Sequence, residues 1–178
     1  MTTETRVNLA STPVAVNVFK PIAAGTYEFE LGDASVKVPG DAFKDATETV
    51  LKTPYIAVQL KAFGEGLPEG GRKYTHNLYI GCVPGTDGIL NYARENGLIA
   101  MFGSLGATPP EIGVVTLEKT NKDGVLITAD HLNPMEIVQA LNNLRGERCK
   151  GRIKIKTETY AGKTADKNEL TRFYSREG

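Results

Sequence analysis

Alternation of apolar and polar side chains in the first half of the chain predicts β-strands. Residues 25–31 place their aromatic and leucine side chains on one face and mainly acidic side chains on the other, as a half-buried strand does. The alternation resumes over 34–38 after a bend. Residues 54–63 and 72–80 repeat it on either side of a glycine-rich loop over 64–71, which predicts a hairpin.

The second half mixes helical spacing with further strands. Apolar residues after Thr86 recur at helical spacing, and Gly97 stands where a left-handed stop is expected. Two short strands flanking residues 121–124 form a second predicted hairpin. A helix is predicted to begin at Asn133-Pro134, because asparagine caps well and proline suits the first helical position.

Two final strands, over about 148–160 and 168–176, complete the predicted elements. Their order favours one mainly β domain, an antiparallel barrel or sandwich with helical insertions, over residues 1–178. Residues 1–21 are expected to form an arm or edge strand. Residues 84–146 are expected to form a helix–hairpin–helix insertion.

Composition indicates a cellular location for the protein and an uneven distribution of charge along the chain. The 178 residues carry 21 basic and 21 acidic side chains, but from Gly146 onward nine basic residues face five acidic ones, a net of +4. No apolar run is long enough for a membrane helix, no secretion signal opens the chain, and Cys82 and Cys149 stand far apart. We therefore expect a protein of the cytoplasm, the host's if it is viral, without membrane partners.

No motif for catalysis or for a cofactor emerges. Gly162-Lys163-Thr164 looks like the end of a phosphate-binding loop, but Thr157 occupies the position of the required first glycine. The two cysteines, His76 and His131 lack the short spacing of a zinc site. Hydrolase signatures are absent as well. We therefore expect no enzyme, no metal and no cofactor.

The basic stretch 150–156 is the most unusual feature. On a strand, alternate side chains share a face, so Lys150, Arg152, Lys154 and Lys156 should form a row while Ile153 and Ile155 face the core. Their spacing of about 6.5–7 Å is close to that of phosphates in an extended single strand. Such a row also arises on edge strands that resist aggregation, so a solvated face is the competing interpretation.

Aromatic rings near the basic row favour binding of single strands, which needs cations for the backbone and flat rings for the bases. Tyr160 should share the face of the row, and a neighbouring row, ending in Arg176, should lie on the last strand. Tyr55, Phe63 and Tyr79 lie on the polar faces of their strands. The complete predicted nucleic-acid-binding set is Tyr55, Lys61, Lys73, Tyr79, Lys150, Arg152, Lys154, Lys156, Tyr160, Arg172 and Tyr174.

Four stretches carry a resemblance to a known family: residues 22–28, 71–73, 144–146 and 163–173. Together the chain resembles a group of phage-encoded proteins with an OB-like fold, found among replication and recombination genes and regarded as single-stranded-DNA-binding. The resemblance implies a five-stranded OB-like barrel with one or two decorating helices, DNA on its open face and no cofactor. It also implies replication or recombination proteins, or further copies of the chain, as partners. The chain ends 172–178 without the acidic tail common in phage single-strand binders.

Two other function classes stay open. A protein-interaction or structural assembly module is favoured by the zero net charge, the glycine-rich loop and the apolar segment 98–105. An enzyme acting on nucleic acid would need a dispersed site that no motif reveals. The hypothesis carried forward is a sequence-tolerant single-stranded-DNA-binding protein of phage-type replication or recombination.

Overall fold

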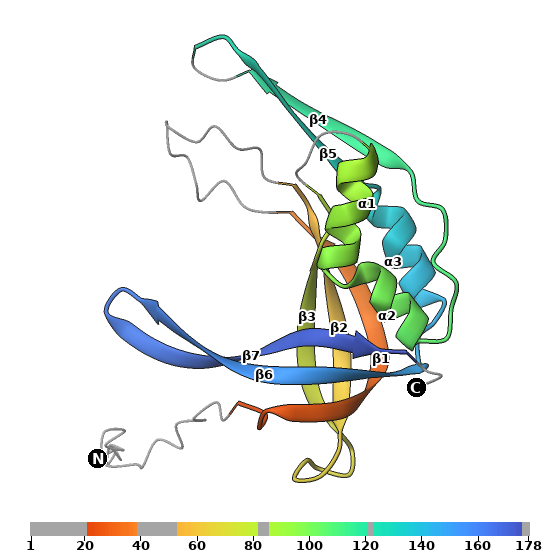
Figure 1. Ribbon diagram of the computed structural model, residues 1–178, viewed down its shortest axis with the longest axis vertical. Helices are drawn as coiled ribbons and strands as arrows, with labels where there is room; N and C mark the ends of the chain where they lie inside the picture. Colours follow the sequence, from red (N-terminus) through yellow and green to blue (C-terminus); the bar gives the residue numbers. More distant parts are fainter. Residues whose placement is uncertain (1–20, 39–52, 82–85, 121–122, 176–178) are drawn as a thin grey trace, which may run out of the picture.

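The computed structural model describes residues 21–38, 53–81, 86–120 and 123–175. Its centre is a five-stranded antiparallel sheet with the order β3-β2-β1-β6-β7 (Figure 1). The five strands are β1 (Gly25–Lys37), β2 (Tyr55–Phe63), β3 (Arg72–Tyr79), β6 (Arg148–Tyr160) and β7 (Lys163–Tyr174). The expected arm 1–21 lies outside the described residues except for Pro21.

Between β3 and β6 the chain forms three helices and a separate hairpin. The helices are α1 (Thr86–Glu95), α2 (Leu98–Ser104) and α3 (Pro134–Asn142), and the hairpin joins β4 (Val114–Thr120) to β5 (Leu126–Leu132). The expectation of one or two helices is therefore wrong, because residues 98–104 form a helix of their own. Its buried residues include Leu98, Met101 and Phe102, so this apolar segment belongs to the core and does not form an exposed surface for contact with other proteins.

The start of α3 follows the sequence prediction. Asn133 caps the helix and accepts a hydrogen bond from the N–H of Met135, and Pro134 takes the first helical position. Glu136 accepts from the N–H of Gly113 at 2.9 Å. The cap region is thereby tied to the segment that leads into β4.

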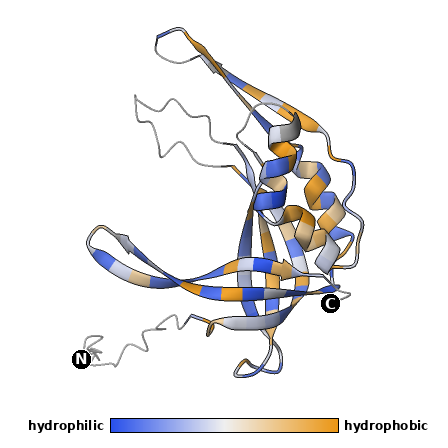
Figure 2. Cartoon of the chain, viewed as in Figure 1, coloured by the Kyte–Doolittle hydropathy of each residue, from blue (hydrophilic) through white to orange (hydrophobic). Residues whose placement is uncertain are grey.

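One continuous core joins the inner face of the sheet to the helices. Phe29, Ile56 and Ile153 are fully buried on three neighbouring strands and pack in the same cluster as Ile137 and Met101 of the helices. Alternation along β1 and β2 places mainly polar side chains on the opposite face, with Ala57 and Phe63 as exceptions. Figure 2 shows the bands of hydrophilic and hydrophobic residues along the strands. The mainly β class with helical insertions is confirmed.

The sheet is not closed into a barrel, which corrects the expected closed arrangement. Across the gap, the Tyr74 hydroxyl of β3 accepts from the N–H of Leu170 at 3.1 Å and lies 3.4 Å from the carbonyl of Asn168, both in β7. The His76 ring meets the Phe173 ring edge-on, with centroids 5.6 Å apart. In a closed barrel the backbones of β3 and β7 would hydrogen-bond to each other. Here side chains of β3 bridge the two strands instead.

Strands β6 and β7 continue beyond the sheet as a two-stranded ribbon. Pairing with β1 ends at Ile153, whereas pairing with β7 continues to Tyr160 (Figure 1). Ile155 was expected in the core but is 44% exposed, because no third strand or helix among the described residues covers the ribbon at that point. The ribbon turns at Ala161 and Gly162, both with positive φ, so the apparent phosphate-loop motif is a hairpin turn.

Candidate nucleic-acid interface

Eight of the eleven predicted binding residues share one face of the five-stranded sheet. We call this the outer face; its side chains alternate with the buried ones. The strand registers place on it Tyr55, Lys61, Lys73, Tyr79, Lys150, Arg152, Arg172 and Tyr174. Residues distant in sequence therefore meet on one surface, as expected from the alternation of each strand.

Lys154 and Lys156 extend the row along the ribbon, beyond the sheet. Lys154 lies opposite Glu169 in the register, and Lys156 lies 3.9 Å from the carboxylate of Glu158. Glu158 also binds Lys167 at 2.7 Å, and that hydrogen bond lowers the pKa of the carboxyl. These two lysines are therefore partly balanced by acids that the sequence row did not reveal. Tyr160 ends β6, but its side chain lies outside the described part of the structure, as does Arg176.

Three cations of the predicted set lie together where β6 and β7 join the sheet. Arg152 and Arg172 are directly opposite each other, and Lys150 is opposite Tyr174. No ion pair connects these three cations to an acid within the described ranges. The Arg172 guanidinium lies 5.1 Å from the centre of the Tyr174 ring, close enough for a cation–π contact.

A second group of similar composition lies on β2 and β3. Lys61 and Lys73 are directly opposite each other, and Tyr55 is opposite Tyr79 at the other end of the same strands. The two tyrosine rings are 5.7 Å apart at an angle of 38°, and Tyr79 is 50% exposed. The outer face therefore carries two opposed cation pairs and a pair of rings.

Residues that the sequence did not single out lie between the two groups. Arg148 binds Glu28 at 3.2 Å and Glu30 at 3.8 Å, and its guanidinium lies 4.4 Å above the Phe63 ring. Lys61 is opposite Glu30, and Lys150 is opposite Glu28. The alternation of β1 could have placed the two glutamates on this face, but only the register shows which cations surround them.

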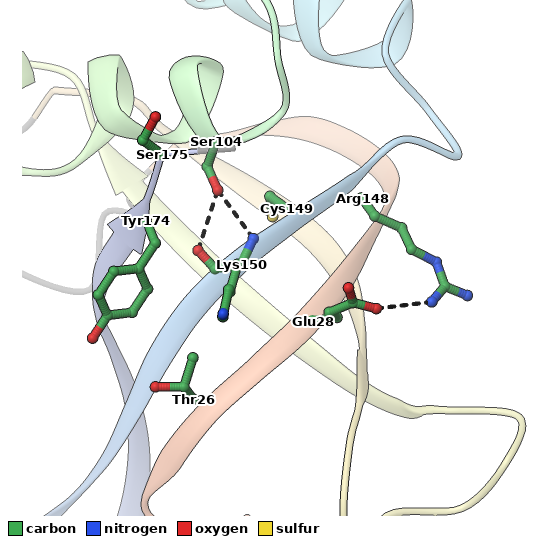
Figure 3. A pocket seen from close by; sticks show the side chains of 8 residues that line it. All are labelled: Thr26, Glu28, Ser104, Arg148, Cys149, Lys150, Tyr174 and Ser175. Carbon is green, nitrogen blue, oxygen red and sulfur yellow. Dashed lines mark hydrogen bonds and ion pairs between the residues drawn. The ribbon is translucent and has the colours of Figure 1, made fainter. Parts of the chain in front are cut away.

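A hollow of about 840 Å³ opens beside the basic end of the outer face (Figure 3). Thr26, Glu28, Lys150 and Tyr174 line it from three neighbouring strands, and Ser104 lines it from α2. The buried Ser104 hydroxyl accepts from the Lys150 N–H at 3.0 Å and donates to the Lys150 carbonyl at 3.2 Å. This pair of bonds fixes the end of α2 against the strand that carries the basic row.

Two largely buried titratable groups, His76 and Cys149, lie in or at the edge of the core, and Cys149 also contributes to the lining of the hollow. Burial lowers the pKa of His76 to about 4 and raises the pKa of the Cys149 thiol to about 12. Over the described ranges, no three His, Cys, Asp or Glu side chains come close enough to hold a metal ion. None of the described helices has the length and apolar character needed to cross a membrane.

Comparison with known proteins adds no assignment. No protein-family model matches the chain, and no curated protein matches it significantly. The resemblance carried by the short motifs therefore stays a prediction, and the functional argument depends on the geometry of the outer face.

Proposed function

We propose that the protein binds single-stranded DNA on the outer face, with broad tolerance of sequence. The proposal is carried by two pairs of like charges that lie directly opposite each other on a face that also bears tyrosines. The pairs are Arg152 with Arg172 and Lys61 with Lys73. Like charges directly opposite each other destabilise a sheet. Phosphates lying between the two members of each pair would remove that repulsion.

The arrangement suits a flexible single strand. Cations that follow the backbone and rings that accept any base are the two requirements for binding without strong sequence preference. The outer face supplies the cations on four strands and exposed or half-exposed rings at Tyr55, Tyr79 and Tyr174. Protective lysines on an edge strand would not require arginines that oppose each other.

The resemblance to phage-encoded binding proteins supports a role in phage-type replication or recombination, in the cytoplasm of a host. In such a role, binding and stacking are the whole activity, and we propose no catalytic step.

Fluorescence anisotropy with a labelled mixed-sequence oligonucleotide of about 20 nucleotides, longer than one OB fold covers, tests the proposal. We expect a micromolar or tighter Kd at low salt. Binding should weaken steeply as salt is added, because the entropy gained by releasing counterions from the DNA becomes smaller. Replacing Lys150, Arg152 and Arg172 together by Gln should flatten the slope of log K against log salt by about 2.

The matched control replaces Lys154, Lys156 and Lys167 by Gln. This variant loses the same number of charges. Lys156 and Lys167 are also directly opposite each other, but both lie beside the carboxylate of Glu158, at 3.9 Å and 2.7 Å, whereas Arg152 and Arg172 have no described ion pair. We expect a smaller loss of affinity than in the first variant. Absence of any anisotropy change at low salt would overturn the proposal.

A second candidate function, assembly with further copies of the chain, is favoured by one observation. The β4–β5 hairpin exposes Val114, Val125 and Leu126 by 45%, 56% and 58%. A two-stranded hairpin is marginally stable alone, and exposed apolar side chains on it suit a contact. Light scattering should then show an oligomer that Leu126→Glu dissociates, whether or not DNA is present.

A further inference from the structure

The hollow beside the basic row contains a carboxylate where a DNA-binding surface would be expected to avoid one. Glu28 lies in the centre of the outer face, opposite Lys150, and Lys150 in turn lies opposite Tyr174. The neighbouring strands β1, β6 and β7 thus present, side by side, a hydrogen-bond acceptor (Glu28), a donor (Lys150) and an aromatic ring (Tyr174). Figure 3 shows all three side chains around the same hollow.

Glu28 is fixed, but only through one oxygen. Its Oε2 accepts from Arg148 at 3.2 Å, and its side chain is 61% exposed. Within the described ranges no hydrogen bond reaches Oε1. An ionised carboxylate only accepts hydrogen bonds, and it repels a phosphate placed beside it.

A DNA strand that follows the flanking cations must therefore present something other than phosphate at Glu28. The edge of a base that carries an N–H donor complements the carboxylate. Adenine, cytosine and guanine each have an exocyclic amino group, and a glutamate accepts well from that of cytosine. Thymine and uracil present a carbonyl at the corresponding position. Their ring N–H lies between two carbonyl groups, so a carboxylate that accepts from it also faces a carbonyl oxygen.

We propose that the hollow is a base-reading site that favours amino-bearing bases over thymine and uracil, with Glu28 as the acceptor. Lys150 donates to the ring nitrogen or carbonyl beside the amino group, and the Tyr174 ring packs on the base. A volume of about 840 Å³ lies within the range of small-molecule sites. This inference rests on the proposed binding of single-stranded DNA. It adds a modest base preference to otherwise tolerant binding.

The experiment compares oligo-dC with oligo-dU of equal length by anisotropy, near pH 7.5. These strands stack weakly and differ at the base edge, where the amino group and ring acceptor of cytosine become a carbonyl and an N–H. We expect oligo-dC to bind about ten times more tightly, in line with the lower end of the range for one hydrogen bond to a charged group. Glu28→Ala should bind both strands equally.

Glu30→Ala is the matched control. Glu30 belongs to the same strand, shares the outer face and binds the same arginine, at 3.8 Å, but does not line the hollow. Both alanine variants remove one negative charge near the DNA, so both should raise the affinity for oligo-dU. Only Glu28→Ala should remove the discrimination. Glu28→Gln, whose amide both donates and accepts, should reduce the preference by binding oligo-dU more tightly.

The outcomes separate the two proposals. Equal binding of oligo-dC and oligo-dU by the unchanged protein overturns the base-reading site and leaves DNA binding intact. A preference that survives in Glu28→Ala, or disappears equally in Glu30→Ala, also overturns it. If neither strand nor a mixed sequence binds, the proposed function itself fails.

Discussion

Arg152 and Arg172 lie directly opposite each other in neighbouring strands. The opposition depends on a bulge, because Ile153 pairs with Leu170 and leaves Thr171 as an extra residue in β7. Phe173 and Leu170 remain in the core on either side of the bulge. The sheet thus holds two cations together without an acid from the described residues between them.

The repulsion between Arg152 and Arg172 predicts that the two arginines lower the stability of the fold while they strengthen DNA binding. Replacing Arg152 and Arg172 together by Gln should raise the free energy of unfolding by about 0.5 kcal/mol, because cross-strand repulsion is removed. The same variant should bind DNA more weakly. Urea titrations followed by circular dichroism measure the first effect and anisotropy the second. If both properties fell, the arginines would be structural.

Gly151 lies at a position of β6 where there is no room for a larger side chain. A Cβ at this buried position would lie 2.7 Å from a Leu170 methyl, 3.1 Å from the carbonyl oxygen of Arg172 and 3.3 Å from the Phe29 ring. Gly151→Val should destabilise the protein by about 2 kcal/mol through overpacking. Thermal unfolding measures the change, and Thr157→Val, at an exposed position on the same strand, is the control.

The strand faces could be predicted from sequence, whereas their relative placement could not. Alternation alone located Lys61, Lys73, Lys150 and Arg152 on polar faces. The partner across each strand depends on register, which the bulges in β1 and β7 shift. Local sequence therefore could not show that Glu169 opposes Lys154 or that two arginines oppose each other.

Burial was also predicted correctly only where the sheet continues. Ile153 and Ile155 have the same local pattern, yet β1 pairs beside the first and has ended before the second. Similarly, the apolar segment 98–105 suggested a contact surface for other proteins, but its apolar side chains pack into the core. In both cases the outcome depends on a distant part of the chain.

Cys149 should be chemically silent in the folded protein. It is buried, and a pKa of about 12 keeps the thiol protonated at neutral pH, whereas the thiolate is the reactive form. In a Cys82→Ser variant, which leaves a single thiol, a disulfide reagent at pH 8 should react only after denaturant is added. Rapid reaction without denaturant would show that β6 opens readily near Cys149.

His76 predicts that stability falls in mild acid. Its pKa is about 4 in the folded protein and 6.5 when exposed, because burial disfavours the charged ring. The unfolded chain therefore binds the proton more strongly, and stability is lost as pH falls from 6.5 towards 4. Between pH 7 and pH 5 the free energy of unfolding should decrease by about 2 kcal/mol from this group.

His76→Leu isolates the contribution of this ring, since leucine fills the site without titrating. Its free energy of unfolding should vary less between pH 7 and pH 5 than that of the unchanged protein, by about the same 2 kcal/mol. Urea midpoints at several pH values give both curves. Parallel curves would mean that the ring beside Phe173 admits water or a proton without unfolding. The contact between β3 and β7 would then be looser than the 5.6 Å separation of the two rings indicates.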